Sequence, residues 1–149
     1  MKKLSPILSF FLSLNAFAQE GKFGLGIIVG EPTGLSAKVW TSQTNAFDAA
    51  LAWRVNHRYG DALQLHASFL KHSFGLIDVE KGRLPFYFGI GAKVILANDP
   101  LVGVRIPLGI SYIFADAPLD LFLEIVPVLN LIPSTDFDVD GGIGIRYYF

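Results

Sequence analysis

Alternation of apolar residues with polar or small residues, at a period of two, is the feature that most constrains this sequence. It recurs in eight segments separated by turn residues, and the segments are residues 22–30, 35–40, 46–54, 62–72, 84–96, 101–114, 119–130 and 137–149. Successive side chains of a β-strand point to opposite faces, so each segment predicts a strand with two different faces. The pattern is clearest in residues 101–114, where every even position from Val102 to Phe114 is apolar.

The apolar content is high but distributed along the chain. Hydrophobic residues make up 52% of the sequence, yet prolines and glycines interrupt every apolar stretch after residue 18. A transmembrane helix needs about 20 consecutive apolar residues, whereas a tilted transmembrane strand needs only about 9–11. An even number of two-faced segments of this length is what a membrane barrel requires. We therefore predict an all-β protein, an eight-stranded antiparallel up-and-down transmembrane β-barrel.

The N-terminus reads as a secretory signal peptide. Lys2 and Lys3 precede a short apolar stretch, residues 4–17, and residues 16–18 (Ala-Phe-Ala) have the small-x-small pattern that signal peptidase accepts. We expect cleavage after Ala18, so that residues 1–18 are the signal peptide and residues 19–149 form the barrel. The mature chain is then an exported protein.

The residue composition of the two faces of the predicted strands indicates which face points into the barrel. One face is almost entirely Leu, Ile, Val, Phe, Ala, Tyr and Trp, whereas the other mixes Gly, Ala and Ser with isolated charges. An eight-stranded barrel is just wide enough for side chains to fill, and small polar residues suit such a lumen. Charges enclosed there need partners. We therefore predict a lumen charge network of Lys38, Asp48, Arg54, His66, Lys93, Arg105, Glu124 and Arg146.

Turn positions give an expected strand register. A turn centred on residue 43 places Lys38 opposite Asp48, which would pair their charges across the strands. The first turn would place Gly26 opposite Lys38, a small residue against a large one. At the last turn we expect Glu124 to lie diagonally from Arg146, within reach of long side chains.

One expected pair of neighbours carries like charges. Lys93 and Arg105 would lie near each other on the polar face. Because two buried cations repel each other, we expect an acid to lie between them, either Glu124 or an acidic loop residue.

Aromatic residues gather near the ends of the segments. Membrane barrels carry aromatic girdles at both bilayer interfaces, so we expect Trp40, Trp53, Tyr112 and Phe114 to be interfacial. The two histidines at segment ends, His57 and His72, are expected to be solvated or interfacial.

The last six residues, Gly-Ile-Arg-Tyr-Tyr-Phe, carry a resemblance. With Gly144, Tyr147 and terminal Phe149, they resemble the C-terminal signal Gly-x-x-aromatic-x-Phe that the outer-membrane assembly machinery reads. The whole region resembles small outer-membrane barrels of the OmpA/OmpX type. It is also similar to uncharacterised porin-family-like proteins with a Gly-Glu-Pro-Thr-Gly turn, here residues 30–34. The resemblance implies a Gram-negative outer membrane, periplasmic termini, and outer-membrane lipid and lipopolysaccharide as surroundings.

The sequence contains no catalytic constellation that we expect to be active. His66 and Ser68, with Asp48 diagonal to His66, are the best candidates for a lipid- or lipopolysaccharide-modifying enzyme, but they are expected in mid-lumen, where substrate has poor access. Residues 136, 138 and 140 are aspartates, yet they lack the spacing of a calcium loop. We therefore expect no enzyme activity, no cofactor and no metal.

Four further functions are weighed against an envelope protein. A net charge of −1 argues against nucleic-acid binding. Eight strands leave no useful aqueous pore, and the loops expected on the extracellular side are short, which argues against an adhesin. A soluble periplasmic, lipocalin-like ligand-binding barrel stays open if the faces are inverted. We expect a monomeric barrel with a structural or envelope-interaction role.

Overall fold

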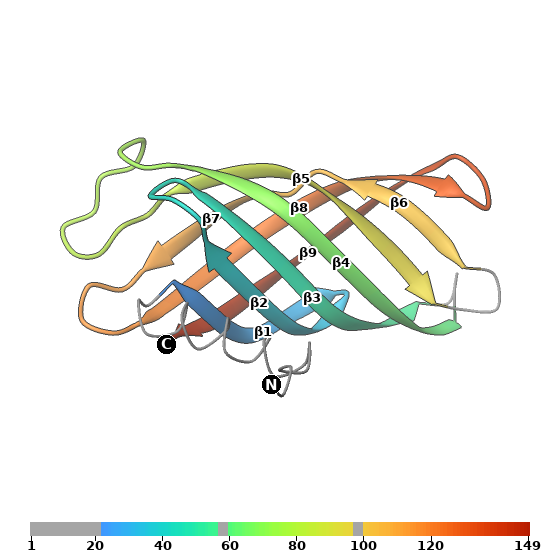
Figure 1. Ribbon diagram of the computed structural model, residues 1–149, viewed down its shortest axis with the longest axis horizontal. Helices are drawn as coiled ribbons and strands as arrows, with labels where there is room; N and C mark the ends of the chain where they lie inside the picture. The colour runs from blue at the N-terminus through green and yellow to red at the C-terminus, as the bar shows by residue number, and fades with distance from the viewer. Residues whose placement is uncertain (1–21, 57–59, 97–99) are drawn as a thin grey trace, which may run out of the picture.

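A computed structural model describes residues 22–56, 60–96 and 100–149, and the predicted signal peptide lies outside them. These residues form an all-β structure (Figure 1). Its strands are β1 (Phe23–Glu31), β2 (Thr33–Trp40), β3 (Asn45–Asn56), β4 (Gly60–Ser73), β5 (Phe86–Leu96), β6 (Leu101–Arg105), β7 (Leu108–Ile113), β8 (Leu119–Ile132) and β9 (Asp136–Tyr148). Within the described ranges, no helix is long and apolar enough to cross a membrane.

The strands close into a ring. β1 to β5 pair antiparallel in sequence order, β6 and β7 both pair with β5 and β8, and β9 pairs with β8 and with β1. Figure 1 shows the strands inclined around a common axis. Among the strands that the structure describes, closure leaves no unpaired sheet edge, as an up-and-down barrel requires. The predicted antiparallel barrel is confirmed.

β6 and β7 are two parts of one barrel strand, so nine named strands make an eight-stranded barrel. The register of both parts against β5 and β8 continues unchanged across the break at residues 106–107. The Ile106 amide donates to the Pro127 carbonyl at 2.9 Å, and the Gly89 amide donates to the Pro107 carbonyl at 3.0 Å. Pro107 has no amide hydrogen, so one bond of the ladder is missing and the assigned strand is interrupted.

The barrel is apolar outside and polar inside. Alternate residues of each strand are exposed and buried: in β8, Leu121, Leu123 and Ile125 are exposed while Asp120 and Glu124 are buried. The exposed set is almost wholly Leu, Ile, Val and aromatic residues, and the buried set holds most of the charges of the strands. This distribution is the reverse of that in a soluble barrel, and it agrees with the predicted face assignment.

The two ends of the barrel differ. The end at which β1 starts and β9 finishes, here called the terminal end, carries the connections 41–44, 74–85 and 114–118. Ile77 and Val79 of the connection 74–85 are exposed and lie in no strand. The base of the connection is fixed instead, because the Tyr112 hydroxyl donates to the Lys81 carbonyl at 2.6 Å.

Candidate functional site: the polar interior

The inward positions of the strands build a polar interior. Its buried side chains include Ser36, Lys38, Asp48, Gln64, His66, Ser68, His72, Lys93, Arg105, Ser111, Asp120, Glu124, Asn130, Asp140 and Arg146. They come from every strand except β1, whose inward positions are mainly glycines and Ile28. Small residues on β1 and β9 therefore leave room for long side chains from the other strands.

Arg146 is the centre of the first cluster. Its guanidinium lies 3.8 Å from a carboxylate oxygen of Asp48 on one side and 3.8 Å from one of Asp120 on the other. Its Nε donates to the Ser36 hydroxyl at 3.0 Å, and its Cζ lies 3.8 Å from the centre of the Phe122 ring. One buried cation thus stands between two buried carboxylates.

Arg105 and Glu124 form a second cluster. Their side chains are 3.6 Å apart, and Arg105 also donates to the Ser68 hydroxyl at 2.8 Å. The Tyr87 hydroxyl donates to Glu124 at 2.9 Å. Glu124 therefore pairs with a cation and accepts a hydrogen bond from a phenol, and it is only 4% exposed.

Lys93 has its own acid. Lys93 and Arg105 occupy diagonal positions on β5 and β6, as expected. Lys93 Nζ, however, lies 3.3 Å from Asp140 of β9, on the far side of the lumen, while Arg105 faces Glu124. The like charges are therefore separated by two different carboxylates, one of which, Asp140, we did not assign to the network.

Lys38 and His72 form a contact between two basic groups. Lys38 Nζ lies 2.7 Å from His72 Nε2, and His72 Nδ1 lies 3.0 Å from the Thr44 carbonyl oxygen. The ammonium lies 4.4 Å from the centre of the Trp40 ring and 5.4 Å from that of Tyr87. Lys38 and His72 are only 1% and 2% exposed, so of the two expectations for His72, solvated or interfacial, the first is wrong.

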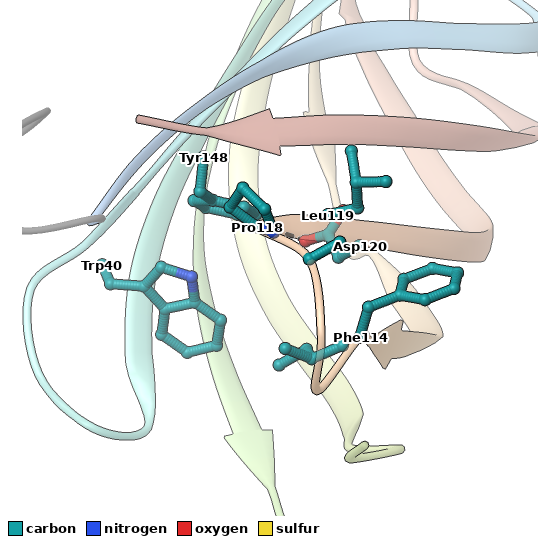
Figure 2. A pocket seen from close by; sticks show the side chains of 8 residues that line it. Trp40, Phe114, Pro118, Leu119, Asp120 and Tyr148 are labelled. Atoms are coloured by element: carbon teal, nitrogen blue, oxygen red, sulfur yellow. Dashed lines mark hydrogen bonds between the residues drawn. The ribbon is translucent and has the colours of Figure 1, made fainter. Parts of the chain in front are cut away.

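A cavity of about 210 Å³ lies at the terminal end, beside this contact. Trp40, Phe114, Pro118 and Tyr148 line it (Figure 2), and Asp120 is at its edge. The Tyr148 hydroxyl donates to Asp120 at 2.6 Å, and Arg146 balances the charge of the same carboxylate. The lining is mostly apolar and its charges are already balanced, so it does not specify the charge of a ligand.

The expected registers are right in part. Lys38 lies opposite Asp48, as predicted. Gly24 rather than Gly26 lies opposite Lys38. Asp120 lies opposite Arg146, and Glu124 lies opposite Gly142, so Glu124 is not diagonal to Arg146 as expected. Those two expectations are wrong by whole periods of the strand, because the β1–β2 and β8–β9 turns do not fall where we centred them.

The structure describes the side chains of seven of the eight residues expected in the lumen network. Lys38, Asp48, His66, Lys93, Arg105, Glu124 and Arg146 are all buried inside the barrel. The Arg54 side chain lies outside the described part of the structure. His66 lies 2.8 Å from Gln64 and is diagonal to Asp48.

Two of the four expected interfacial aromatics are placed differently. Trp53 is exposed on the outer surface, and Tyr112 is half-buried there, with its ring 4.9 Å from that of Phe114. Trp40 instead faces the lumen, because it shares a face with Lys38, and Phe114 lines the cavity at the mouth. Near the C-terminus, Tyr147 and Phe149 are exposed, with their rings 5.3 Å apart.

Sequence reasoning missed several members of the network. His72, Tyr87, Asp120, Asp140 and Tyr148 all contribute contacts inside the barrel. All of them occupy positions with inward parity in their strands, so the alternation itself could have identified them.

Comparisons with known proteins show the fold alone. No family model matches the sequence, and no curated protein matches it either. Among solved structures, the chain is similar to the N-terminal β-barrel domain of OprF from Pseudomonas aeruginosa, with 11% identity and a TM-score of 0.62. The match covers 85% of this chain and 96% of that domain. The expected likeness to small barrels of the OmpA type is therefore confirmed at the level of the fold.

Proposed function

We propose that this chain is an integral outer-membrane barrel whose polar interior is a structural network rather than a passage or an active site. The observation that supports this most directly is the reversed polarity of the barrel, with apolar side chains outside and charged ones inside. In water, such a surface would expose an apolar area far larger than soluble monomers show. Lipid tails can cover this apolar surface, and the closed ring of strands gives the backbone amides and carbonyls their hydrogen-bond partners.

The interior contacts support a structural role. Arg146, Arg105 and Lys93 come from β9, β6 and β5, and their carboxylate partners come from β3, β8 and β9. Each ion pair therefore joins different strands, and two of them, Arg146–Asp48 and Lys93–Asp140, join strands that are not neighbours. Contacts across the lumen stabilise the closed shape, and side chains of this size fill an eight-stranded lumen.

The same geometry disfavours the alternatives. A lipocalin-like barrel needs an apolar interior for its ligand, and this interior is charged. A lipid-modifying enzyme needs an accessible nucleophile and base, but Ser68 and His66 are both buried, and Ser68 accepts a hydrogen bond from buried Arg105. We propose a monomer inserted by the outer-membrane assembly machinery, in contact with lipid and lipopolysaccharide, without enzyme activity.

A heat-modifiability gel on envelope fractions tests the proposal. The unboiled protein is expected in the outer-membrane fraction and should migrate differently after boiling, because a closed barrel resists detergent until it is heated. As a control, deletion of Phe149, the last residue of the expected assembly signal, should reduce the shifted form. A protein found in the soluble periplasm with no shift would overturn the proposal and leave a soluble ligand-binding barrel in its place.

A further inference from the structure

The cavity at the terminal end is built where several strands finish. Trp40 is the last residue of β2, Tyr148 is the last residue of β9, and the turn between β7 and β8 supplies Phe114 and Pro118. Figure 2 shows Trp40 on one side of the cavity and Phe114 on the other. The cavity is partly enclosed and has a volume of about 210 Å³. It is therefore a small pocket at the mouth, distinct in its lining from the charged interior.

The walls of this pocket are aromatic and aliphatic. Trp40, Phe114 and Tyr148 contribute aromatic rings. The other side chains that line it, apart from Asp120, are aliphatic: Ile113, Ala117, Pro118 and Leu119. Such walls offer few hydrogen-bond partners to water, so they hold an apolar group better than water. A ligand ring gains further from edge-to-face or offset contacts with the aromatic walls.

Charges of both signs stand close to the pocket. Asp120 is the carboxylate among the lining residues, and it lies 3.8 Å from Arg146. Lys38 is not among the lining residues, but its ammonium lies 4.4 Å from the centre of the Trp40 ring. An anion would thus meet Asp120, and a cation would meet Lys38 near the opposite wall. Because an ion of either sign would lose its water and gain no free counter-ion, the pocket favours a neutral molecule.

The volume of the pocket sets the size of the ligand. An apolar cavity of about 150 Å³ is large enough to bind benzene. The pocket at the mouth is somewhat larger, so it has room for one six-membered ring with a small substituent. Because the pocket is only partly enclosed, a polar substituent can stay in contact with water.

We propose that this pocket binds neutral molecules that contain a single aromatic ring. The ring lies between Trp40 and Phe114, and its polar substituent points to the open side of the pocket. Binding involves no covalent step and uses none of the ion pairs of the interior. The proposal therefore goes beyond the structural role of the charged network and does not depend on that role.

Fluorine NMR tests the proposal with 4-fluorobenzamide, which is neutral and has one ring. The probe is added to the mature barrel in lipid nanodiscs, and empty nanodiscs report its partition into lipid. We expect a saturable change in its resonance that empty nanodiscs do not give. The anion 4-fluorobenzoate and the cation 4-fluorobenzylamine, which have the same ring, should show no saturable change. The proposal is overturned if the neutral probe gives no saturable change, as when a lipid chain fills the pocket, or if all three probes bind equally.

Two variants in one turn locate the binding. Ala117→Phe places a ring in the pocket and should abolish the change, whereas Ala115→Phe adds the same ring at an exposed position and should leave it intact. Ala117→Leu replaces the first variant if it does not fold, and the heat-modifiable form reports folding of each. In the Trp53→Phe barrel, Trp40 is the remaining tryptophan, and its emission should change as 4-fluorobenzamide binds. Binding that survives the substitutions at Ala117, or that leaves Trp40 emission constant, would contradict the assignment.

Discussion

At the scale of single residues, the interior is a set of charges that depend on one another. Arg146 stands between Asp48 and Asp120, and all three are buried. A buried ion pair adds little stability over apolar packing, but removal of one partner leaves an uncompensated charge. The stability of the barrel is therefore more sensitive to the loss of one of these charges than to the loss of all three together.

Arg146→Met should therefore destabilise the barrel strongly. We expect a loss of about 3–5 kcal/mol in the free energy of unfolding, because two carboxylates then remain buried without their cation. Urea unfolding in lipid vesicles measures this loss. The matched control is the triple variant Asp48→Asn, Asp120→Asn and Arg146→Met, which removes all three charges and should recover most of the stability. A single variant that unfolds like the parent would show that solvent already reaches this cluster.

At the scale of the strand, close packing between neighbouring strands depends on glycine. A methyl group added at Gly144 would overlap the Phe122 ring and the Ile27 carbonyl. Gly141, three residues earlier in β9, points outward, and the nearest atom to its added methyl, the Glu124 carbonyl oxygen, is 3.0 Å away. Gly144 of the expected assembly signal thus also has a steric role in the folded barrel.

Gly144→Ala is expected to cost about 1–3 kcal/mol of unfolding free energy through overpacking, and Gly141→Ala much less. The two variants share a strand and a chemical change, so their difference isolates the inward packing. Both variants are refolded from urea into lipid vesicles, a step that needs no assembly machinery, and their free energies of unfolding are then compared. Equal effects of the two substitutions would mean that the Phe122 ring moves aside at little cost.

The strands also show how much of the fold could be predicted from the sequence. The alternation predicted the strands and the inward or outward side of Lys38, Arg105 and Glu124, because period two and burial are linked directly. It did not predict which residues face one another: Gly24 replaces Gly26 opposite Lys38, a shift of two residues that keeps every side chain on its expected face. Such a shift is invisible to hydrophobic patterning, so cross-strand partners had to come from the structure.

At the scale of the whole molecule, the long-range contacts were beyond prediction for a related reason. Lys93–Asp140 and Arg146–Asp48 cross the lumen between strands that are not neighbours. Their geometry depends on the closure, tilt and diameter of the barrel together. No turn in the sequence determines the closure, tilt or diameter of the barrel. The outer apolar surface, in contrast, follows from the alternation within each strand separately.

That outer surface gives a prediction about the surrounding medium. Ile125 and Ile132 are both exposed on β8, at 60% and 55%, but Ile125 lies near the middle of the strand and Ile132 at its end. In a bilayer, Ile125→Arg should cost about 2–4 kcal/mol and Ile132→Arg about 0–1 kcal/mol, because the penalty for arginine falls from the midplane to the interface. Urea unfolding in vesicles measures both. In water the same two substitutions would be nearly equivalent, so equal effects would count against a barrel that spans the membrane, and a clear difference would place the middle of β8 in the hydrocarbon core.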